Sequence, residues 1–130
     1  MGIQAQFLII VVGIVICLTS VAFADQGTAT YYAPPYIPSA CYSRQDNGIM
    51  VAGASDGIWN NRAACGTNYR VKCIGAANTA PHPCKDGESV VVKIVDYCDR
   101  CNGTINLSQD AFAKISNPDI GKIRVQYDRV

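Results

Sequence analysis

The sequence predicts a mainly β fold, a small barrel of short strands held together by disulfides. Several short runs rich in β-branched and aromatic residues alternate between apolar and polar positions, as half-buried strands do. One run alone has the pattern of a helix. Six cysteines follow the first apolar segment of this 130-residue chain, which is the cysteine content of a disulfide-stapled extracellular domain.

The beginning of the chain is predicted to be a signal peptide. Its first twenty-four residues contain no Lys, Arg, Asp or Glu, and residues 7–18 are almost entirely apolar. The segment ends in Ala22-Phe23-Ala24, a small-x-small pattern that precedes signal-peptidase cleavage. A membrane anchor is the alternative, but the apolar run is marginal against the roughly 20 residues that a spanning helix needs. We expect a signal peptide at 1–24, one domain at 25–130, and no membrane insertion after cleavage.

The charge balance argues against a polyanionic partner. Eleven Lys and Arg face ten Asp and Glu, and all of them lie in the predicted domain. A chain so close to neutral has no long-range field that would steer it to nucleic acid or acidic lipid. We therefore expect no nucleic-acid partner.

The cysteines predict a disulfide framework. Cys17 lies in the predicted signal peptide, and the even number that remains in a short secreted chain favours structural disulfides. Each bridge restricts the unfolded chain and stabilises the fold by about 3 kcal/mol. The sequence leaves the pairing open among the six cysteines of the predicted domain, which are Cys41, Cys65, Cys73, Cys84, Cys98 and Cys101.

The first half of the domain predicts one clear strand and a long turn-rich segment. Thr and Tyr fill residues 28–32, which favours a strand that Pro34-Pro35 ends. From there to residue 57, Pro, Ser, Asn and Gly dominate. The apolar patch at 49–52 predicts one short strand inside this segment.

The second half predicts three strands and a helix. Residues 69–76 and 122–128 alternate, and residues 89–96 form a β-branched run that is the strongest strand signal of the chain. Ser108 is a suitable N-cap for a helix over residues 109–115. Five or six short strands and one helix together favour a barrel closed by pairing between distant segments.

The turn after the strongest strand carries the residues with the most chemistry. Cys98-x-x-Cys101 permits a structural disulfide, a redox pair or half of a zinc site. The redox interpretation lacks the βαβ context of such motifs, and zinc would need His82 and Cys84 as further ligands. We favour the disulfide and expect no metal and no cofactor. His82, the only histidine, lies between two prolines and has no evident catalytic partner.

The motifs resemble those of the first domain of plant expansins over essentially the whole predicted domain. That domain is a six-stranded double-psi β-barrel with one or two short helices, related to family forty-five endoglucanases and to barwin. Within this group, the chain is most similar to the plant natriuretic peptides in its single-domain length and in the sequence of residues 101–108. These peptides are small apoplastic proteins. The matching motifs are Gly27-Thr28-Ala29-Thr30-Tyr31-Tyr32, Ala64-Cys65-Gly66, Tyr69-Arg70-Val71-Lys72-Cys73, Val95-Asp96-Tyr97-Cys98 and Asn106-Leu107-Ser108-Gln109-Asp110-Ala111-Phe112.

The resemblance also implies a cleft that has lost its catalytic acid. The related hydrolases use two carboxyl groups, one as acid and one as base. Asp96 matches one acidic position, and Thr30 and Tyr32 match residues that line the cleft. Asn106 occupies the second acidic position, and an amide cannot supply a proton there. We predict that the chain is not an enzyme, and we leave open whether Asp96 contacts a ligand or accepts backbone hydrogen bonds at a turn.

The leading functional expectation from the resemblance is signalling. A monomeric protein of the plant natriuretic peptide type would act in water and solute homeostasis in the apoplast through a cell-surface receptor. The resemblance attributes this activity to residues 36–69. The candidate contacts there are Tyr36, Tyr42, Arg44, Trp59 and Arg62, although core packing is the alternative for Trp59 and solvation for the two arginines.

The alternative expectation is binding of a cell-wall polysaccharide without hydrolysis. Sugar rings would stack on Tyr31, Tyr32 or Trp59. A defence role of the barwin kind is a third interpretation, which the residues neither favour nor exclude. Two sequences also match the acceptor for N-linked glycans, and we predict glycosylation of Asn102 on a loop rather than of Asn106 in the cleft.

Overall fold

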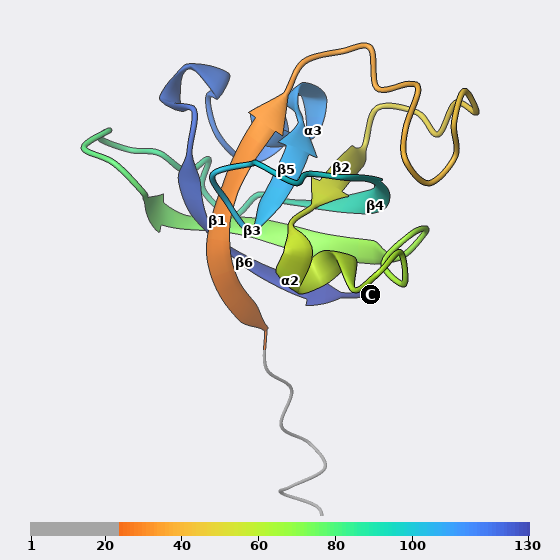
Figure 1. The fold of residues 1–130 in the computed structure, drawn as a ribbon. Coiled ribbons are helices and arrows are strands. Elements are labelled where there is room, and N and C mark those ends of the chain that lie inside the picture. The colour runs from red at the N-terminus through yellow and green to blue at the C-terminus, as the bar shows by residue number, and fades with distance from the viewer. Residues whose placement is uncertain (1–23) are drawn as a thin grey trace, which may run out of the picture.

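Six strands close into a barrel in the computed structural model, which describes residues 24–130 (Figure 1). The order around the barrel is β1-β5-β2-β4-β3-β6. This confirms the predicted β-barrel. Apart from Ala24, the predicted signal peptide lies outside the described residues. The strands are β1 (Asp25–Tyr32), β2 (Val51–Ala54), β3 (Asn68–Ala76), β4 (Ser89–Tyr97), β5 (Ile105–Ser108) and β6 (Ile123–Arg129).

Pairing between distant segments places β2 between β4 and β5. β1 pairs with β5 and β2 with β4 in parallel, whereas the other four pairs are antiparallel. In this register Gly53 of β2 lies opposite Asn106 on β5 and opposite Asp96 on β4. The two positions that the resemblance matches to the acidic residues of related hydrolases therefore flank one glycine.

The core is continuous between the barrel and the helix α3 (Gln109–Ile115), whose bounds match the prediction. The Ser108 hydroxyl accepts a hydrogen bond from the N–H of Ala111 at 3.0 Å and so caps the helix as expected. Phe112 is fully buried, and its ring centre lies 5.0 Å from that of Tyr31 on β1. This packing attaches α3 to the barrel.

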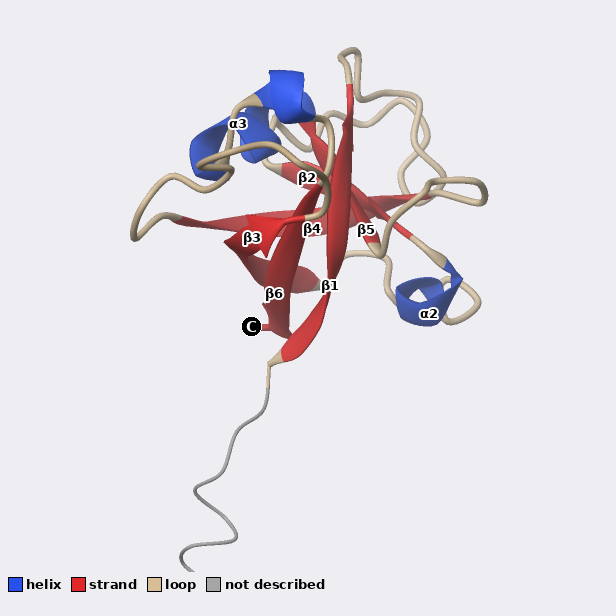
Figure 2. Cartoon of the chain, turned by 90° about the vertical axis from the view of Figure 1, so that its left-hand side faces the viewer, coloured by secondary structure: helices blue, strands red, loops and turns tan. Residues whose placement is uncertain are grey.

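The short strand predicted at residues 49–52 is present as β2, shifted by two residues, whereas several other short elements were not predicted from the sequence pattern. Three of the four residues of β5 are buried, so this strand does not show the alternation of a half-exposed strand. α2 (Asp56–Trp59) and the 3₁₀ helix η1 (Pro118–Ile120) are single turns too short to produce a periodic pattern. Figure 2 shows α2 and α3 at opposite ends of the barrel.

The cysteines form three disulfides, which confirms the structural interpretation of the Cys98-x-x-Cys101 motif. The pairs are Cys41–Cys65, Cys73–Cys84 and Cys98–Cys101. Because Cys84 is bonded to Cys73, it is not available as a zinc ligand. The first pair ties the turn-rich segment before β2 to the turn after α2, and the last closes the turn after β4.

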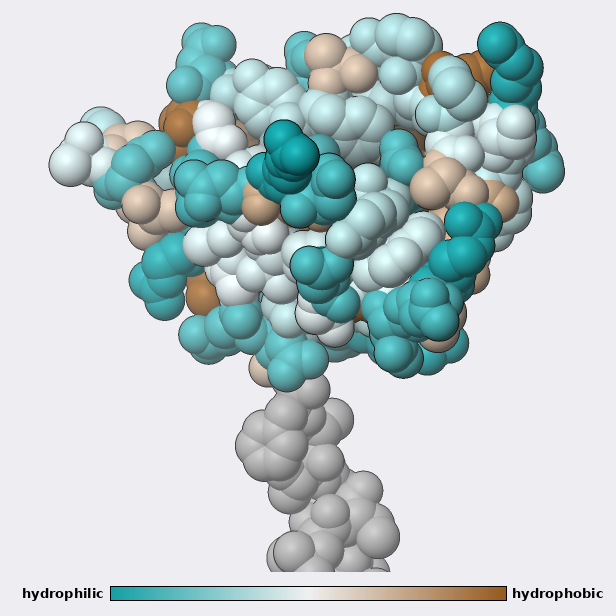
Figure 3. All heavy atoms as spheres, viewed as in Figure 1, coloured by the Kyte–Doolittle hydropathy of each residue, from teal (hydrophilic) through white to brown (hydrophobic). Residues whose placement is uncertain are grey.

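Within residues 24–130 there is no helix with the length and apolar character needed to cross a bilayer. On the face shown in Figure 3, hydrophobic side chains are scattered among polar ones and form no continuous patch.

Candidate functional site

A cleft of about 460 Å³ lies where β1 and β4 end beside β5. The structure brings all four predicted cleft residues, Thr30, Tyr32, Asp96 and Asn106, into this one cleft. Gly53 lies in its lining between two of them, and the turn at residues 98–102 forms one rim. Segments more than seventy residues apart in the sequence therefore build a single site.

The floor of the cleft holds Asn106 by a hydrogen bond from the neighbouring strand. The Thr30 hydroxyl donates to Asn106 Oδ1 at 2.9 Å. Since the amide oxygen accepts this bond, the two N–H donors of Nδ2 remain for other partners. Across Gly53, two strand spacings separate the backbones of Asn106 and Asp96 by roughly 10 Å. An amide and a carboxylate thus occupy places where a related hydrolase would hold two carboxyl groups.

Asp96 combines a structural contact with a place in the cleft. Its Oδ1 accepts the N–H of Ala40 at 3.0 Å and the N–H of Tyr97 at 2.9 Å. The carboxylate therefore ties the turn-rich segment before β2 to the end of β4, as its structural interpretation predicted. The same side chain also lines the cleft, so this contact does not remove Asp96 from reach of a ligand.

Tyr32 presents a phenol without a protein partner. Its hydroxyl is buried and has no hydrogen-bond partner among the described residues. Burial, followed by the negative charge of Asp96, raises the pKa of Tyr32 above the ordinary tyrosine value of 10.0. The ring meets that of Tyr36 edge to face at 5.3 Å between centres, and the Tyr36 hydroxyl donates to Asp110 at 2.5 Å. These contacts hold Tyr32 in place at the cleft.

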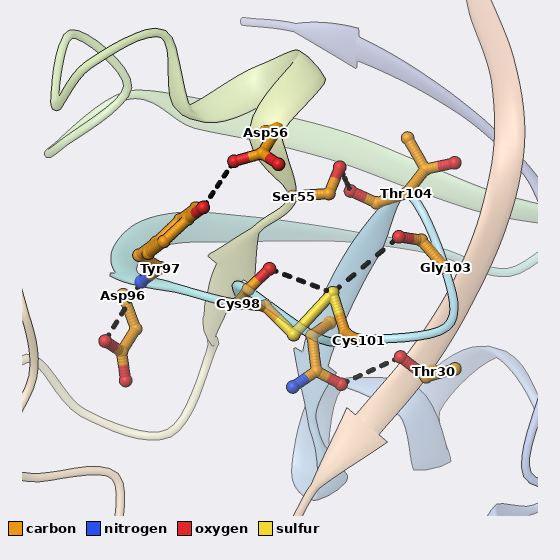
Figure 4. The surroundings of a disulfide bond; sticks show 10 residues. Thr30, Ser55, Asp56, Asp96, Tyr97, Cys98, Cys101, Gly103 and Thr104 are labelled. Carbon is orange, nitrogen blue, oxygen red and sulfur yellow. Dashed lines mark hydrogen bonds between the residues drawn. A yellow bond between two sulfur atoms is a disulfide. The ribbon is translucent and has the colours of Figure 1, made fainter.

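Tyr97 is the cleft residue that sequence reasoning missed. Its ring stacks on Trp59 with 5.1 Å between centres and 29° between planes, and the Arg62 guanidinium lies 5.8 Å from the centre of the Trp59 ring. The Tyr97 hydroxyl donates to Asp56, which raises the pKa of the phenol (Figure 4). Tyr97 is therefore among the residues that line the cleft, but its ring is turned toward Asp56 and away from the side chains of Asp96 and Thr30 (Figure 4). Its position beside Asp96 at the end of the strongest predicted strand was the available signal.

The predicted receptor-contact residues are mostly engaged within the molecule. Lys93 Nζ lies 4.5 Å from the centre of the Tyr42 ring, and the Arg62 guanidinium donates to the Ala40 carbonyl at 2.8 Å. Trp59 is partly buried and packs against the core as well as on Tyr97. Arg44 is exposed. The structure does not gather these residues, together with Tyr36, into one site.

The residues considered as metal ligands and as glycan acceptors lie in different parts of the molecule. Across residues 24–130 no group of three or more His, Cys, Asp or Glu side chains is close enough to hold a metal ion. His82 is exposed. Asn102 is exposed in the rim turn, whereas Asn106 is half-buried in the floor.

The comparisons with known proteins agree with this fold. The family model described as lytic transglycolase matches residues 51–127. An EG45-like domain containing protein of Citrus jambhiri is 50% identical over 99% of both chains. EG45-like domain containing protein 2 of Arabidopsis thaliana is 46% identical over 94% of this chain and 93% of that one.

A solved structure extends the similarity to expansins. A mutant Clavibacter michiganensis expansin in complex with cellohexaose has a TM-score of 0.65 and 25% identity over 83% of this chain. The present chain spans half the length of that protein. The fold is therefore the double-psi β-barrel of the expansin type. The chain belongs to the family of EG45-like domain proteins.

The burial of Tyr32 predicts a specific loss of stability in alkali. The pKa of the Tyr32 phenol is raised in the folded state, so above about pH 10 the unfolded chain releases this proton before the folded protein does. The contribution of Tyr32 to the free energy of unfolding is therefore complete below about pH 10 and is lost as the pH rises further. Urea unfolding should show a falling midpoint above about pH 10. Tyr32→Phe should make this fall shallower, whereas Tyr31→Phe serves as the neighbouring control. Equal slopes for Tyr32→Phe and the unmodified protein would contradict the assignment.

Proposed function

We propose that this protein is secreted to the plant cell wall and binds a polysaccharide chain in its cleft without hydrolysing it. The observation that carries the proposal is one cleft lined by an amide, a carboxylate and a tyrosine whose hydroxyl has no hydrogen-bond partner among the described residues, which are Asn106, Asp96 and Tyr32. The expansin with the same fold in complex with cellohexaose supports a glucan as the ligand class.

Each of these side chains suits a sugar in a different way. Asn106 Nδ2 offers two donors to hydroxyl oxygens, and the Asp96 carboxylate accepts from hydroxyl groups. The Tyr32 ring lies at the cleft, and its edge-to-face contact with Tyr36 limits the rotamer freedom lost on binding. The partnerless Tyr32 hydroxyl gains a partner if a ligand oxygen reaches it.

The same residues argue against hydrolysis. Acid and base catalysis of glycoside cleavage needs a titratable donor on the leaving oxygen and a carboxylate on the other side. Asn106 cannot fill the first role. Asp110 accepts the Tyr36 hydroxyl at the start of α3 and does not line the cleft. Asp99 also lines the cleft, but it lies in the rim turn after β4. It is therefore not part of the paired strands that align Asp96 with Asn106. Binding without cleavage is therefore the proposed activity.

The proposed location follows from the proposed signal peptide. Cleavage after Ala24 would leave residues 25–130, and β1 begins at Asp25, so the proposed boundary leaves the whole barrel intact. Removal of residues 1–24 would release a disulfide-stapled domain into an oxidising compartment, where such bridges persist.

The binding proposal predicts that Asn106 contributes measurable affinity. Calorimetric titration with cellohexaose should show binding to the unmodified protein. Asn106→Ala should weaken this binding by about tenfold, or about 1.4 kcal/mol, because it removes both Nδ2 donors from the cleft. Val91→Ala, at a residue 43% exposed outside the cleft, is the matched control. If unmodified protein fails to bind any soluble glucan or insoluble wall polymer, the proposal is wrong.

A second proposed function is signalling in water and solute homeostasis through residues 36–69, as in plant natriuretic peptides. The exposure of the turn-rich segment between β1 and β2 supports it, and Arg44 is an exposed residue there. The internal contacts of Tyr42, Trp59 and Arg62 favour the cleft as the primary site, because a receptor would have to displace them.

The signalling proposal predicts that Arg44 affects the cellular response but not the binding of a ligand in the cleft. Purified oxidised protein added to plant protoplasts should change their volume. Arg44→Ala should reduce the response while cellohexaose binding stays unchanged. A volume response that Arg44→Ala leaves intact, or no response from the unmodified protein, counts against this role.

A further inference from the structure

The rim of the cleft carries an acceptor sequence for an N-linked glycan. Asn102-Gly103-Thr104 follows directly on Cys101, and Asn102 is both exposed and part of the cleft lining. We propose that a glycan on Asn102 Nδ2 covers the cleft, so that glycosylation controls which secreted molecules can bind a polysaccharide. The control of binding rests on the proposed function, whereas the covering of the cleft does not.

The attachment point is held on both sides and cannot swing away from the cleft. On one side, the Cys98–Cys101 disulfide closes the turn that leaves β4. On the other, the Thr104 N–H donates to the Thr28 carbonyl at 2.8 Å, and the Thr28 N–H donates to Thr104 Oγ1 at 3.1 Å. Asn102 lies between these two anchors. The first sugars of a glycan must therefore start at the rim.

Close backbone approach further restricts this turn. A Cβ on Gly103 would lie 3.3 Å from the Thr28 carbonyl oxygen, and a Cβ on Gly27 would lie 2.3 Å from Thr104 Oγ1. Figure 4 shows Gly103 and Thr104 beside the strand that carries Thr30. The turn is packed closely against β1, so a bulky modification of the exposed Asn102 extends to the solvent side, at the rim of the cleft of about 460 Å³.

The chemistry of attachment points to the nascent chain. In the folded protein Thr104 Oγ1 accepts the Thr28 N–H and the turn lies against β1, so we place the transfer before this turn packs on β1. A bond forms from Asn102 Nδ2 to the anomeric carbon of a lipid-pyrophosphate-linked oligosaccharide. The bond from that carbon to the pyrophosphate breaks, the amide nitrogen releases one proton, and no electrons are transferred.

The second acceptor sequence is unsuitable in the folded protein. In Asn106-Leu107-Ser108 the Ser108 side chain is fully buried, donates to the Ile49 carbonyl at 2.5 Å and caps α3. Asn106 itself lies in the floor, where a glycan would fill the cleft from within. Asn102 is therefore the position at which a glycan and the observed barrel are compatible.

The test uses the full chain secreted from plant cells. Peptide mapping by mass spectrometry should find a glycan on Asn102. Hydroxyl-radical footprinting should show less oxidation of Tyr32 in this protein than in Asn102→Gln, because the glycan shields the cleft that Tyr32 lines. Cellohexaose should bind Asn102→Gln about tenfold more tightly than the glycosylated protein.

A matched control moves the same glycan elsewhere. Asp86→Asn with Glu88→Thr, in the Asn102→Gln background, recreates an Asn-Gly-Thr sequence around Gly87 in the exposed loop between β3 and β4, outside the cleft lining. This protein should oxidise and bind like Asn102→Gln. An unoccupied Asn102, or equal Tyr32 oxidation with and without the Asn102 glycan, overturns the proposal. Shielding of Tyr32 combined with no binding by the glycan-free protein supports the covering glycan and contradicts the proposed function.

Discussion

The strand register around Gly53 is the constraint on which the rest of the molecule depends. Parallel pairing of β2 with β4 and antiparallel pairing with β5 align Gly53 with Asp96 on one side and with Asn106 on the other. A shift of one residue in either pair would turn one of these side chains to the opposite face of the sheet. The buried residues of β2 resist such a shift, so core packing fixes the geometry of the cleft.

The substitution of an amide for an acid determines what this geometry can do. Asn106 keeps the hydrogen bond with Thr30 that a carboxylate would also accept, so the shape of the floor does not require an acid. Proton donation does require one. Under the proposed function, an asparagine at this position would separate recognition from cleavage in this barrel. The Nδ2 donors of Asn106 and the Tyr32 hydroxyl, which has no hydrogen-bond partner in residues 24–130, give such a cleft recognition groups that need no catalysis.

Local signals predicted the elements whose patterns are local. The helix from Gln109 to Ile115 and its Ser108 cap, and the alternating strands β3 and β6, could be read directly from the sequence. The four-residue β5 could not, because its burial comes from β1 and β2, which are distant in the sequence. The disulfide pairing and the stack of Tyr97 on Trp59 were hidden for the same reason, since each depends on how separate segments meet in space.

The most direct test of a cleft that recognises without cutting is an end-point digestion of cellohexaose. Unmodified protein and Asp96→Asn would each be incubated with the oligosaccharide, and the products separated by chromatography. This account predicts that cellohexaose stays intact with both proteins while the unmodified protein binds it. Shorter oligosaccharides that form with the unmodified protein and not with Asp96→Asn would contradict it.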